Sequence, residues 1–332
     1  MNKLSIVIPV YYNEKNLPPL YEDIREKIIK PALFDYEIVM VDDGSGDGSW
    51  PEMEKIAAMD NNVRIYHLSR NFGSHAAILC GLEHCTGDCA VVKAADLQEP
   101  TEIITEMYRK WQEGNNVVLA VREDREESSS QKFFANFYYR LVRTFALKKM
   151  PKNGFDIYLI DRKVINVLSL MDEKDSALTG QILWSGFKTA EVPYVRLERK
   201  IGKSRWTLQK KIKLVMDTLY SFSSVPITMV MLVGAFAFAA SVIWGLIVLI
   251  NKIAGNIPVS GFTTMFIFQL FSFGITMTTL GVIGEYLWRT FNASRNRPIY
   301  IIEKDNVTRN DSSVNERNLN QECSQEGRGD SR

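Results

Sequence analysis

The sequence predicts an α/β domain with a mainly parallel sheet, followed by a transmembrane α-helical hairpin. Three observations indicate this fold class. In the first half, short runs rich in β-branched residues alternate with amphipathic stretches of helical length. In the second half, two long segments contain no charged residue. Finally, a chain of 332 residues exceeds what a single core usually fills, so one large domain plus an additional element is expected.

Each predicted strand is a short apolar run, and the predicted helices lie between these runs. The strands are expected at residues 5–10, 36–41, 63–68, 89–94 and 116–121. The helices are expected near residues 16–30, 49–59, 75–84 and 100–113. Ligands of such sheets bind beyond the carboxyl ends of the strands. The functional residues should therefore follow the apolar runs directly.

The hairpin is predicted from two uncharged segments, with helices at about residues 225–250 and 262–288. At about 1.5 Å per residue, each is long enough to cross a hydrocarbon core of about 30 Å. Basic residues flank the outer ends of both segments, whereas the connecting loop holds only Lys252. The positive-inside rule then places both flanks in the cytoplasm. A pair of buried helices in a large soluble core is the alternative.

Composition divides the chain into four predicted parts. Residues 1–203 form the α/β domain, and residues 204–224 form a lysine-rich amphipathic helix next to the membrane. For this helix, a solvated helix at the domain edge is the alternative. Residues 225–290 form the hairpin. Residues 291–332 form a cytoplasmic tail that is expected to be mostly disordered after residue 303, because it is polar and poor in aromatic residues.

Charge and cysteine content exclude some classes of protein. The 40 basic and 39 acidic side chains leave a net charge of +1, so no nucleic-acid partner is expected. The four cysteines, at positions 80, 85, 89 and 323, do not follow a zinc-finger or zinc-ribbon spacing. We expect a reducing cytosolic setting without disulfides, since no secretory signal precedes the first predicted strand.

Three polar motifs follow predicted strands. The segments from Pro9 to Glu14 and from Asp42 to Ser45 follow the first two strands; carboxylates there can accept hydrogen bonds from a ribose or a base. The segment from Ala95 to Gln98 follows the fourth strand and offers oxygen ligands of the kind that Mg²⁺ or Mn²⁺ prefers. Taken singly, an ordinary turn and an acidic helix start are the alternatives.

In combination, these three motifs resemble those of family 2 nucleotide-sugar glycosyltransferases. The similarity runs from Met1 to Ile302 and is greatest to the branch of dolichol-phosphate mannose synthases and bacterial polyprenyl-phosphate glycosyltransferases. It implies a Rossmann-like GT-A fold, inversion at the anomeric carbon, a divalent metal ion (Mg²⁺ or Mn²⁺) and a cytoplasmic active site. It also suggests a homo-oligomer that associates through the membrane helices.

The resemblance assigns nucleotide and metal roles to particular residues. Contacts to the nucleotide sugar fall on Pro9, Tyr11, Glu14, Asp42, Arg122, Arg199 and Ser204. The resemblance implies that Asp96, which is also a catalytic candidate, and Gln98 bind the metal. The family commonly has a further aspartate where Ala94 stands here. Water, Glu99 or a donor phosphate oxygen could take that position, or metal affinity is weakened or lost.

On the acceptor side, the resemblance assigns Asp156 as the catalytic aspartate and places the acceptor phosphate on Arg125, Lys132 and Asn136. Arg125 and Lys132 could instead be solvated surface charges. The basic segment that contains Arg199 and Ser204 could instead be a membrane-proximal linker. A phosphate monoester has its second pKa near 6, so the nucleophile is already deprotonated at neutral pH. Asp156 would therefore orient the acceptor or balance charge, rather than act as a strong base.

The expected function is transfer of a sugar from a nucleotide sugar, a UDP-sugar, to undecaprenyl phosphate for a cell-envelope glycan. The expected location is the inner membrane, with several spans and with the catalytic domain and both termini in the cytoplasm. Two alternatives stay open. A processive polysaccharide synthase shares the early motifs, but two spans are few for a translocation channel. A non-catalytic scaffold that binds nucleotide sugar or lipid is compatible with Ala94.

Overall fold

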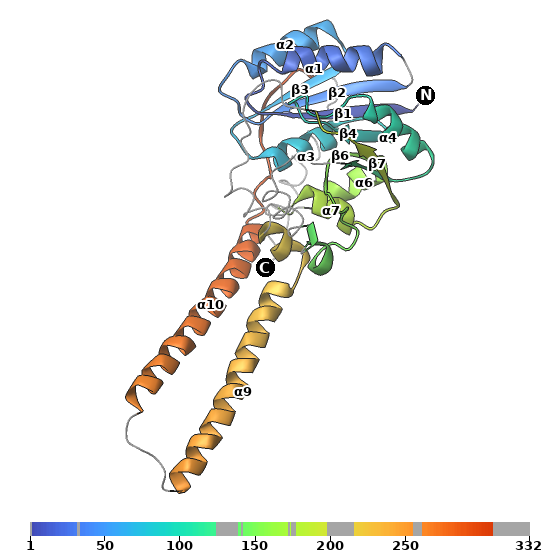
Figure 1. Ribbon diagram of the computed structural model, residues 1–332. Helices are drawn as coiled ribbons and strands as arrows, with labels where there is room; N and C mark the ends of the chain where they lie inside the picture. The colour runs from blue at the N-terminus through green and yellow to red at the C-terminus, as the bar shows by residue number, and fades with distance from the viewer. Residues whose placement is uncertain are drawn as a thin grey trace, which may run out of the picture.

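The computed structural model contains an α/β domain from which a long helical hairpin projects (Figure 1). It describes residues 2–31, 34–123, 139–140, 142–171, 173, 177–197, 216–254 and 261–307. The sheet order is β7-β5-β6-β4-β1-β2-β3-β8. Four of the strand pairs are parallel and three are antiparallel. The predicted α/β class with a mainly parallel sheet is confirmed.

The strands are short, and the central ones are buried on both faces. They are β1 (Lys3–Val10), β2 (Asp35–Asp42), β3 (Val63–Leu68), β4 (Cys89–Val92), β5 (Val117–Arg122), β6 (Phe155–Asp161), β7 (Thr189–Tyr194) and β8 (Ile302–Asp305). The first five occur within two residues of their predicted bounds. Strands covered on both faces have nearly continuous apolar runs, as β1 and β4 do.

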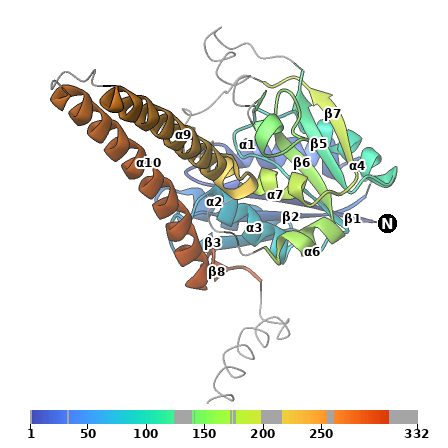
Figure 2. The same ribbon diagram turned by 90° about the horizontal axis from the view of Figure 1, so that it is seen from below.

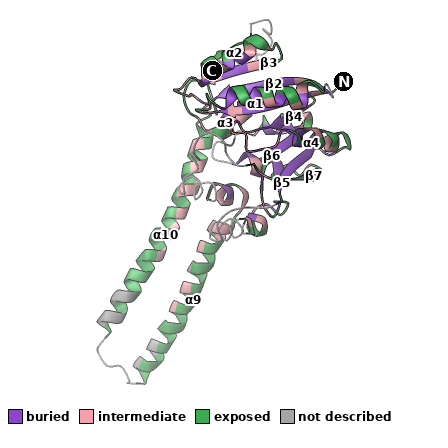
Figure 3. Cartoon of the chain, turned by 45° about the horizontal axis from the view of Figure 1, so that its top comes forward, coloured by how far each residue is buried: buried purple, intermediate pink, exposed green. Residues whose placement is uncertain are grey.

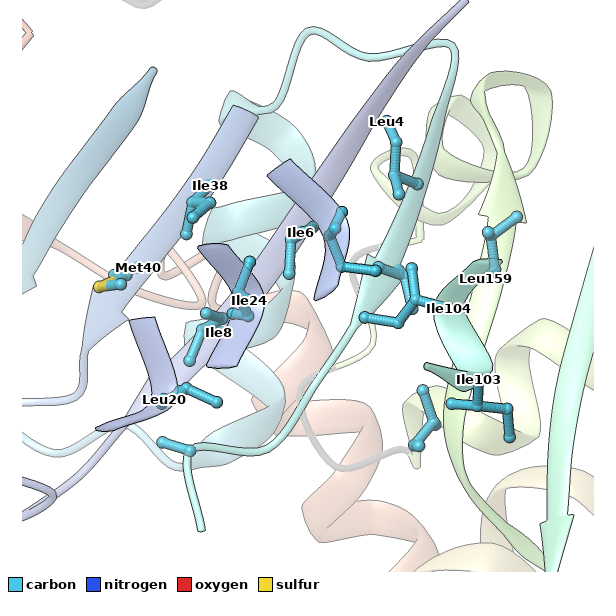
Figure 4. Packing of buried hydrophobic residues seen from close by; sticks show 14 of the residues in the cluster. Leu4, Ile6, Ile8, Leu20, Ile24, Ile38, Met40, Ile103, Ile104 and Leu159 are labelled. Atoms are coloured by element: carbon cyan, nitrogen blue, oxygen red, sulfur yellow. The ribbon is translucent and has the colours of Figure 1, made fainter. Parts of the chain in front are cut away.

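Helices cover both faces of the sheet and form two cores. One face packs against α1 (Leu17–Ile24), α2 (Ser49–Met59) and α4 (Ile103–Gln112). A π-helical turn, η1 (Arg25–Ile29), extends α1. The other face packs against α3 (Ser74–His84), α6 (Arg162–Leu168) and α7 (Leu178–Trp184). Figure 4 shows the first core, where β1 residues Ile6 and Ile8 lie beside Ile24. Alternate β1 side chains enter the two cores, because successive strand residues point to opposite faces.

One edge of the sheet collects the ends of six strands. Val10 pairs with Asp42, so the parallel strands β1 and β2 end together. Strand β4 runs parallel to β1, while the antiparallel strand β6 begins where β4 ends. Strands β5 and β7 end beside the start of β6, with Arg122 paired to Tyr194. We call this side, defined by the carboxyl ends of β1, β2, β4, β5 and β7 and the start of β6, the carboxyl edge.

The hairpin consists of α9 (Val225–Ile253) and α10 (Phe262–Ser294). Segments Val225–Ile247 and Phe268–Ser294 are long and apolar enough to cross a membrane, and neither is buried in the protein. Figure 3 shows the two helices mainly as exposed surface. Of the predicted amphipathic helix at 204–224, residues 216–222 are helical, and residues 204–215 lie outside the described part. Arg289 of α10 forms an ion pair with Asp217 at 2.7 Å and thereby ties this short helix to the hairpin.

After the hairpin, the chain returns to the sheet as strand β8, which lies beside β3 (Figure 2). Ile302 pairs with Leu68, the last residue of β3, so the chain re-enters at the same side as the carboxyl edge. The side chain of Asn306 accepts a hydrogen bond from Ile65 N at 2.8 Å. The tail was predicted to be mostly disordered after residue 303; of its residues, 304 and 305 belong to β8, and 306 and 307 follow that strand. A polar edge strand is held by backbone pairing and needs no apolar pattern; residues 308–332 lie outside the described part.

Candidate active site

The loop after β1 is held against the loop after β2 at the carboxyl edge. Tyr12 adopts a left-handed backbone conformation, with φ of 54°. Its backbone N–H donates to Ser45 Oγ at 2.9 Å. The Glu14 carboxylate accepts from Gly48 N at 3.2 Å. The first two sequence motifs, including Pro9 at the end of β1 and Tyr11 after it, thus form one continuous surface.

The two adjacent aspartates of the second motif are both buried. Asp42 is fully enclosed, and Ser45 Oγ donates to its Oδ1. Its Oδ2 lies 2.7 Å from His67 Nδ1. Asp43 accepts backbone hydrogen bonds from Phe72 and Gly73, but burial outweighs them and raises the pKa of Asp43 to about 6. In this conformation Asp42 shapes the loop from the inside and does not face solvent.

A glycine in the same motif meets a steric requirement. Gly44 has a φ of +67°, and a Cβ built there would lie 2.5 Å from the backbone carbonyl carbon of Arg70. Such a contact cannot relax without moving backbone, so this position accepts only glycine. The close approach packs the second motif against the loop that follows β3.

The third motif forms a tight loop after β4. Leu97 has a φ of 57°, and Asp96 Oδ1 accepts from Gln98 N at 3.2 Å. The Lys93 ammonium is buried and donates to the Glu99 carbonyl oxygen at 2.7 Å. In return, the Glu99 carboxylate accepts from Ala94 N at 3.0 Å. These reciprocal hydrogen bonds close the loop and hold Asp96 at its outer side.

Asp156 sits at the start of β6, next to the end of β5. Arg122 Nε donates to its Oδ2 at 2.6 Å, and the Arg122 Nη2 also contacts this oxygen. The Tyr194 hydroxyl donates to the same Oδ2 at 3.1 Å. Asp156 is 36% exposed, and among the described residues its Oδ1 accepts no hydrogen bond. The arrangement fixes the carboxylate through one oxygen, Oδ2.

The sequence from residue 5 to residue 173 matches the description Glycosyl transferase family 2. The chain belongs to this family. It is 36% identical over 301 residues to the uncharacterized glycosyltransferase YkcC of Bacillus subtilis, covering 90% of this chain and 93% of that one. It is 33% identical over 304 residues to the SfII prophage-derived bactoprenol glucosyl transferase of Shigella flexneri, covering 91% and 98%. The predicted glycosyltransferase class is confirmed.

Solved structures with a similar fold include a mannosyltransferase from Pyrobaculum calidifontis in complex with GDP-Man and Mn²⁺. It shares 15% sequence identity with this glycosyltransferase and covers 84% of this chain and 87% of its own, with a TM-score of 0.45. That similarity is too low to transfer any site residue. The assignment of roles therefore depends on the geometry of this chain alone.

The residues around Asp96 match a metal site only in part. Ala94 has no ligand atom on its side chain, and Glu99 is buried and turned toward Ala94 N, so Glu99 does not replace the missing aspartate. Within the described residues, no group of three or more histidines, cysteines, aspartates or glutamates could hold a metal ion. Mg²⁺ often keeps several waters and binds through one or two carboxylates plus substrate phosphates. The donor set fits a metal shared between Asp96 and substrate oxygens, and does not fit one held by the protein alone.

Burial also changes the charge balance beneath this loop. Burial raises the pKa of Glu99 to about 7, and it lowers the pKa of Lys93. Each side chain partly offsets the effect of burial on the other, since the Lys93 charge lowers the pKa of Glu99 and the Glu99 charge raises the pKa of Lys93.

The structure brings together the predicted residues that it describes. Pro9, Tyr11, Glu14, Asp42, Asp96, Gln98, Arg122 and Asp156 all lie at or directly beyond the carboxyl edge. The predicted Arg125, Lys132, Asn136, Arg199 and Ser204 lie outside the described residues. Two surface recesses lie elsewhere, one of about 370 Å³ beside Trp111 and Asp161 and one of about 580 Å³ between α1 and α2. Asp161 ends β6, so the first recess opens at the opposite edge.

Two residues of the site were not predicted from the sequence. His67 contacts Asp42, and Tyr194 contacts Asp156. Each contacts a residue far away in the chain, so no local motif marks it. Arg196 belongs to the basic segment that resembles the family's loop over the donor, and the structure adds its contact to Gln98.

Proposed function

We propose that this glycosyltransferase transfers a sugar from a UDP-sugar to a polyprenyl phosphate, such as undecaprenyl phosphate, at the cytoplasmic face of the inner membrane. One observation carries the proposal: the three motif loops and Asp156 lie at the same sheet edge to which the chain returns from the hairpin. Relatives named bactoprenol glucosyl transferase, which align over the hairpin as well, support the acceptor class.

The donor side of the proposal uses the loops after β1 and β2. Tyr11 and Glu14 are the residues that would contact the nucleoside, with Pro9 fixing the end of β1. Asp42 is fully enclosed and bound to Ser45 and His67, so its role would be to hold the shape of this loop. A carboxylate whose oxygens are already occupied stabilises a conformation more readily than it binds a new ligand.

The metal, Mg²⁺ or Mn²⁺, would be held by Asp96 together with oxygens of the donor diphosphate. When bound, it would neutralise negative charge on the departing nucleoside diphosphate. Gln98 contributes less than the sequence suggested, because its Oε1 accepts a hydrogen bond from Arg196 at 2.7 Å. The chain's own contribution here is the loop from Lys93 to Glu99, which keeps Asp96 at the edge.

The acceptor side would use Asp156. An oxygen of the lipid phosphate attacks the anomeric carbon, the bond from that carbon to the diphosphate oxygen breaks, and the nucleoside diphosphate leaves with the electron pair. Attack from the face opposite the leaving group inverts the anomeric centre. Asp156 would orient the acceptor through Oδ1, while Arg122 and Tyr194 hold the carboxylate by Oδ2. We retain Arg125, Lys132 and Asn136 as proposed phosphate ligands, and Arg199 and Ser204 as proposed donor contacts.

The hairpin explains why a lipid phosphate is a suitable acceptor for this protein. A lipid phosphate is confined to the membrane surface, so a tethered enzyme meets it at high effective concentration. Residues 295–301 connect α10 to Ile302, and eight steps of about 3.5 Å limit this span to about 28 Å. The end of α10 therefore lies within a short reach of the carboxyl edge. We propose a multi-pass arrangement with both termini cytoplasmic, a membrane partner and a homo-oligomer.

The test is a transfer assay on membranes that contain the protein. A panel of labelled nucleotide sugars is incubated with polyprenyl phosphate, with and without Mg²⁺ or Mn²⁺. Organic-extractable label from one UDP-sugar is the expected result. Long water-soluble polymer would instead indicate a processive synthase, and nucleotide binding without turnover would indicate a scaffold. Either of these two outcomes would overturn the proposal.

A further inference from the structure

The segment after β7 is fastened to the loop that carries Asp96. Leu197 N donates to the Gln98 carbonyl oxygen at 2.8 Å, and Arg196 Nη2 donates to Gln98 Oε1 at 2.7 Å. The Gln98 side-chain amide also approaches the Leu197 carbonyl oxygen at 3.4 Å. These contacts join residues that are 98 or 99 positions apart in the chain. They hold the Arg196 guanidinium directly on the third motif.

Arg196 differs from the other cations of the site in having no described counter-charge. Arg122 is paired with Asp156, and the Lys93 ammonium is buried beneath the loop. The partner of Arg196 is the neutral amide of Gln98, and no ion pair within the described residues includes Arg196. Its Nε–H is enclosed and has no hydrogen-bond partner in the part of the chain that the structure describes. An enclosed donor of this kind is costly unless an acceptor arrives.

The same loop lacks a ligand that a metal ion would use. Ala94 offers no oxygen, and Gln98 Oε1 is already used by the guanidinium. A divalent ion at Asp96 would thus have one carboxylate, whereas a fixed positive charge is bound to Gln98 of the same loop. A departing diphosphate gains negative charge as its bond to the sugar breaks, and preorganised positive groups stabilise that charge. A planar guanidinium can donate two parallel hydrogen bonds to phosphate oxygens.

We propose that Arg196 is a leaving-group residue: it donates to the diphosphate of the donor and takes over part of the role that a divalent metal would have. The inference rests on the proposed function and adds to it a prediction about metal dependence. The electron pair of the broken bond goes to the diphosphate oxygen, and no proton changes place at Arg196. Transfer should then be only weakly dependent on added metal.

The transfer assay tests this with Arg196→Gln, Arg196→Lys and the control Arg109→Gln. Arg109 is exposed on α4, and among the described residues it forms an ion pair only with Glu113, which follows that helix. We expect Arg196→Gln to lower kcat by roughly 10²–10³-fold, Arg196→Lys to lie between it and wild type, and Arg109→Gln to match wild type. In EDTA the wild type should keep more than about one tenth of its rate. Ala94→Asp should increase the loss of rate in EDTA by at least about tenfold, because it restores a carboxylate ligand.

Two binding measurements do not depend on turnover. Mn²⁺ binding, followed by electron paramagnetic resonance, should be weak in the wild type and at least about tenfold tighter in Ala94→Asp. Binding of UDP and GDP in EDTA should be measurable for at least one nucleotide in the wild type. It should be about tenfold or more weaker in Arg196→Gln, intermediate in Arg196→Lys and unchanged in Arg109→Gln. Thermal unfolding of each variant reports whether the fold is intact.

The outcomes separate this inference from the proposed function. If no nucleotide sugar supports transfer to polyprenyl phosphate, the proposed function fails, but the binding measurements still decide about Arg196. Equal nucleotide binding by Arg196→Gln and wild type in EDTA would overturn the inference, as would the absence of any UDP or GDP binding by the wild type in EDTA. Tight Mn²⁺ binding by the wild type together with complete loss of transfer in EDTA would overturn it as well.

Discussion

Tyr194→Phe removes the hydroxyl that donates to Asp156 Oδ2 at 3.1 Å and leaves the aromatic ring in the core. A hydrogen bond to a charged group contributes about 1.5–3 kcal/mol. Arg122 keeps its own contacts to the same oxygen, so the lower end of this range applies. A barrier increase of about 1.5 kcal/mol corresponds to about a tenfold lower kcat. The KM for the nucleotide sugar should be unchanged, because the donor loops are untouched.

Tyr21→Phe is the matched control for this prediction. The Tyr21 hydroxyl donates to Asp60 Oδ2, also at 3.1 Å, and Asp60 follows α2 at the opposite edge of the sheet. Both variants should lose a similar amount of thermal stability, whereas only Tyr194→Phe should lose turnover. The assay is label transfer to lipid over a range of donor concentrations. If Tyr194→Phe kept kcat within about twofold of wild type, positioning of Asp156 by Tyr194 would be refuted.

Three further predictions follow from contacts described above. Asp96→Ala should lower transfer by up to about tenfold, as removal of the metal with EDTA does, while membrane extraction still finds the chain inserted; an unchanged rate would remove Asp96 from the metal. Burial alone would raise the pKa of Glu37, but hydrogen bonds from Ser5, Thr86 and Lys3 outweigh burial and lower the pKa from 4.5 to about 2. This shift stabilises the fold by roughly 3 kcal/mol above pH 4.5, and the stabilisation is lost as the pH falls toward 2. Glu37→Gln should therefore unfold at a lower temperature than wild type at pH 7, with a difference that shrinks below pH 4.5; a constant difference would contradict this. Asn306→Ala should lower the free energy of unfolding by about 1–3 kcal/mol, because it removes hydrogen bonds to Ile65 N and Val63 O, and equal denaturant midpoints would exclude that role.

The predicted strands are apolar runs whose residues are largely buried, whereas β6 also packs on both faces of the sheet and was not predicted. Every residue of β4 is buried, so its sequence is an uninterrupted apolar run. Strand β7 contains Pro193 and alternates buried with exposed residues near its end, and no strand was predicted there. Strand β8 has no buried residue. An edge strand forms by pairing with the backbone of a neighbouring strand, and that neighbour cannot be identified from a short stretch of sequence.

In the site, too, some residues could be identified from the local sequence, and others only from contacts between distant residues. Asp42 and Asp96 stand directly after apolar runs, so their place at the carboxyl edge follows from strand order. The contacts of His67, Tyr194 and Arg196 join residues 25, 38 and 98 positions apart. No spacing rule reaches across such separations. The enclosure of Asp42 is likewise a tertiary property, since it depends on a histidine from β3.

The path of the chain has a consequence for the order of assembly. The outer edge of β3 has no pairing partner until residues 302–305 have been made, and these are synthesised after both long helices. An unpaired strand edge can pair with the wrong strand or with another chain, which leads to aggregation. The sheet of the α/β domain is therefore complete only after the hairpin has been synthesised. Until then, the outer edge of β3 is open to pairing with other strands.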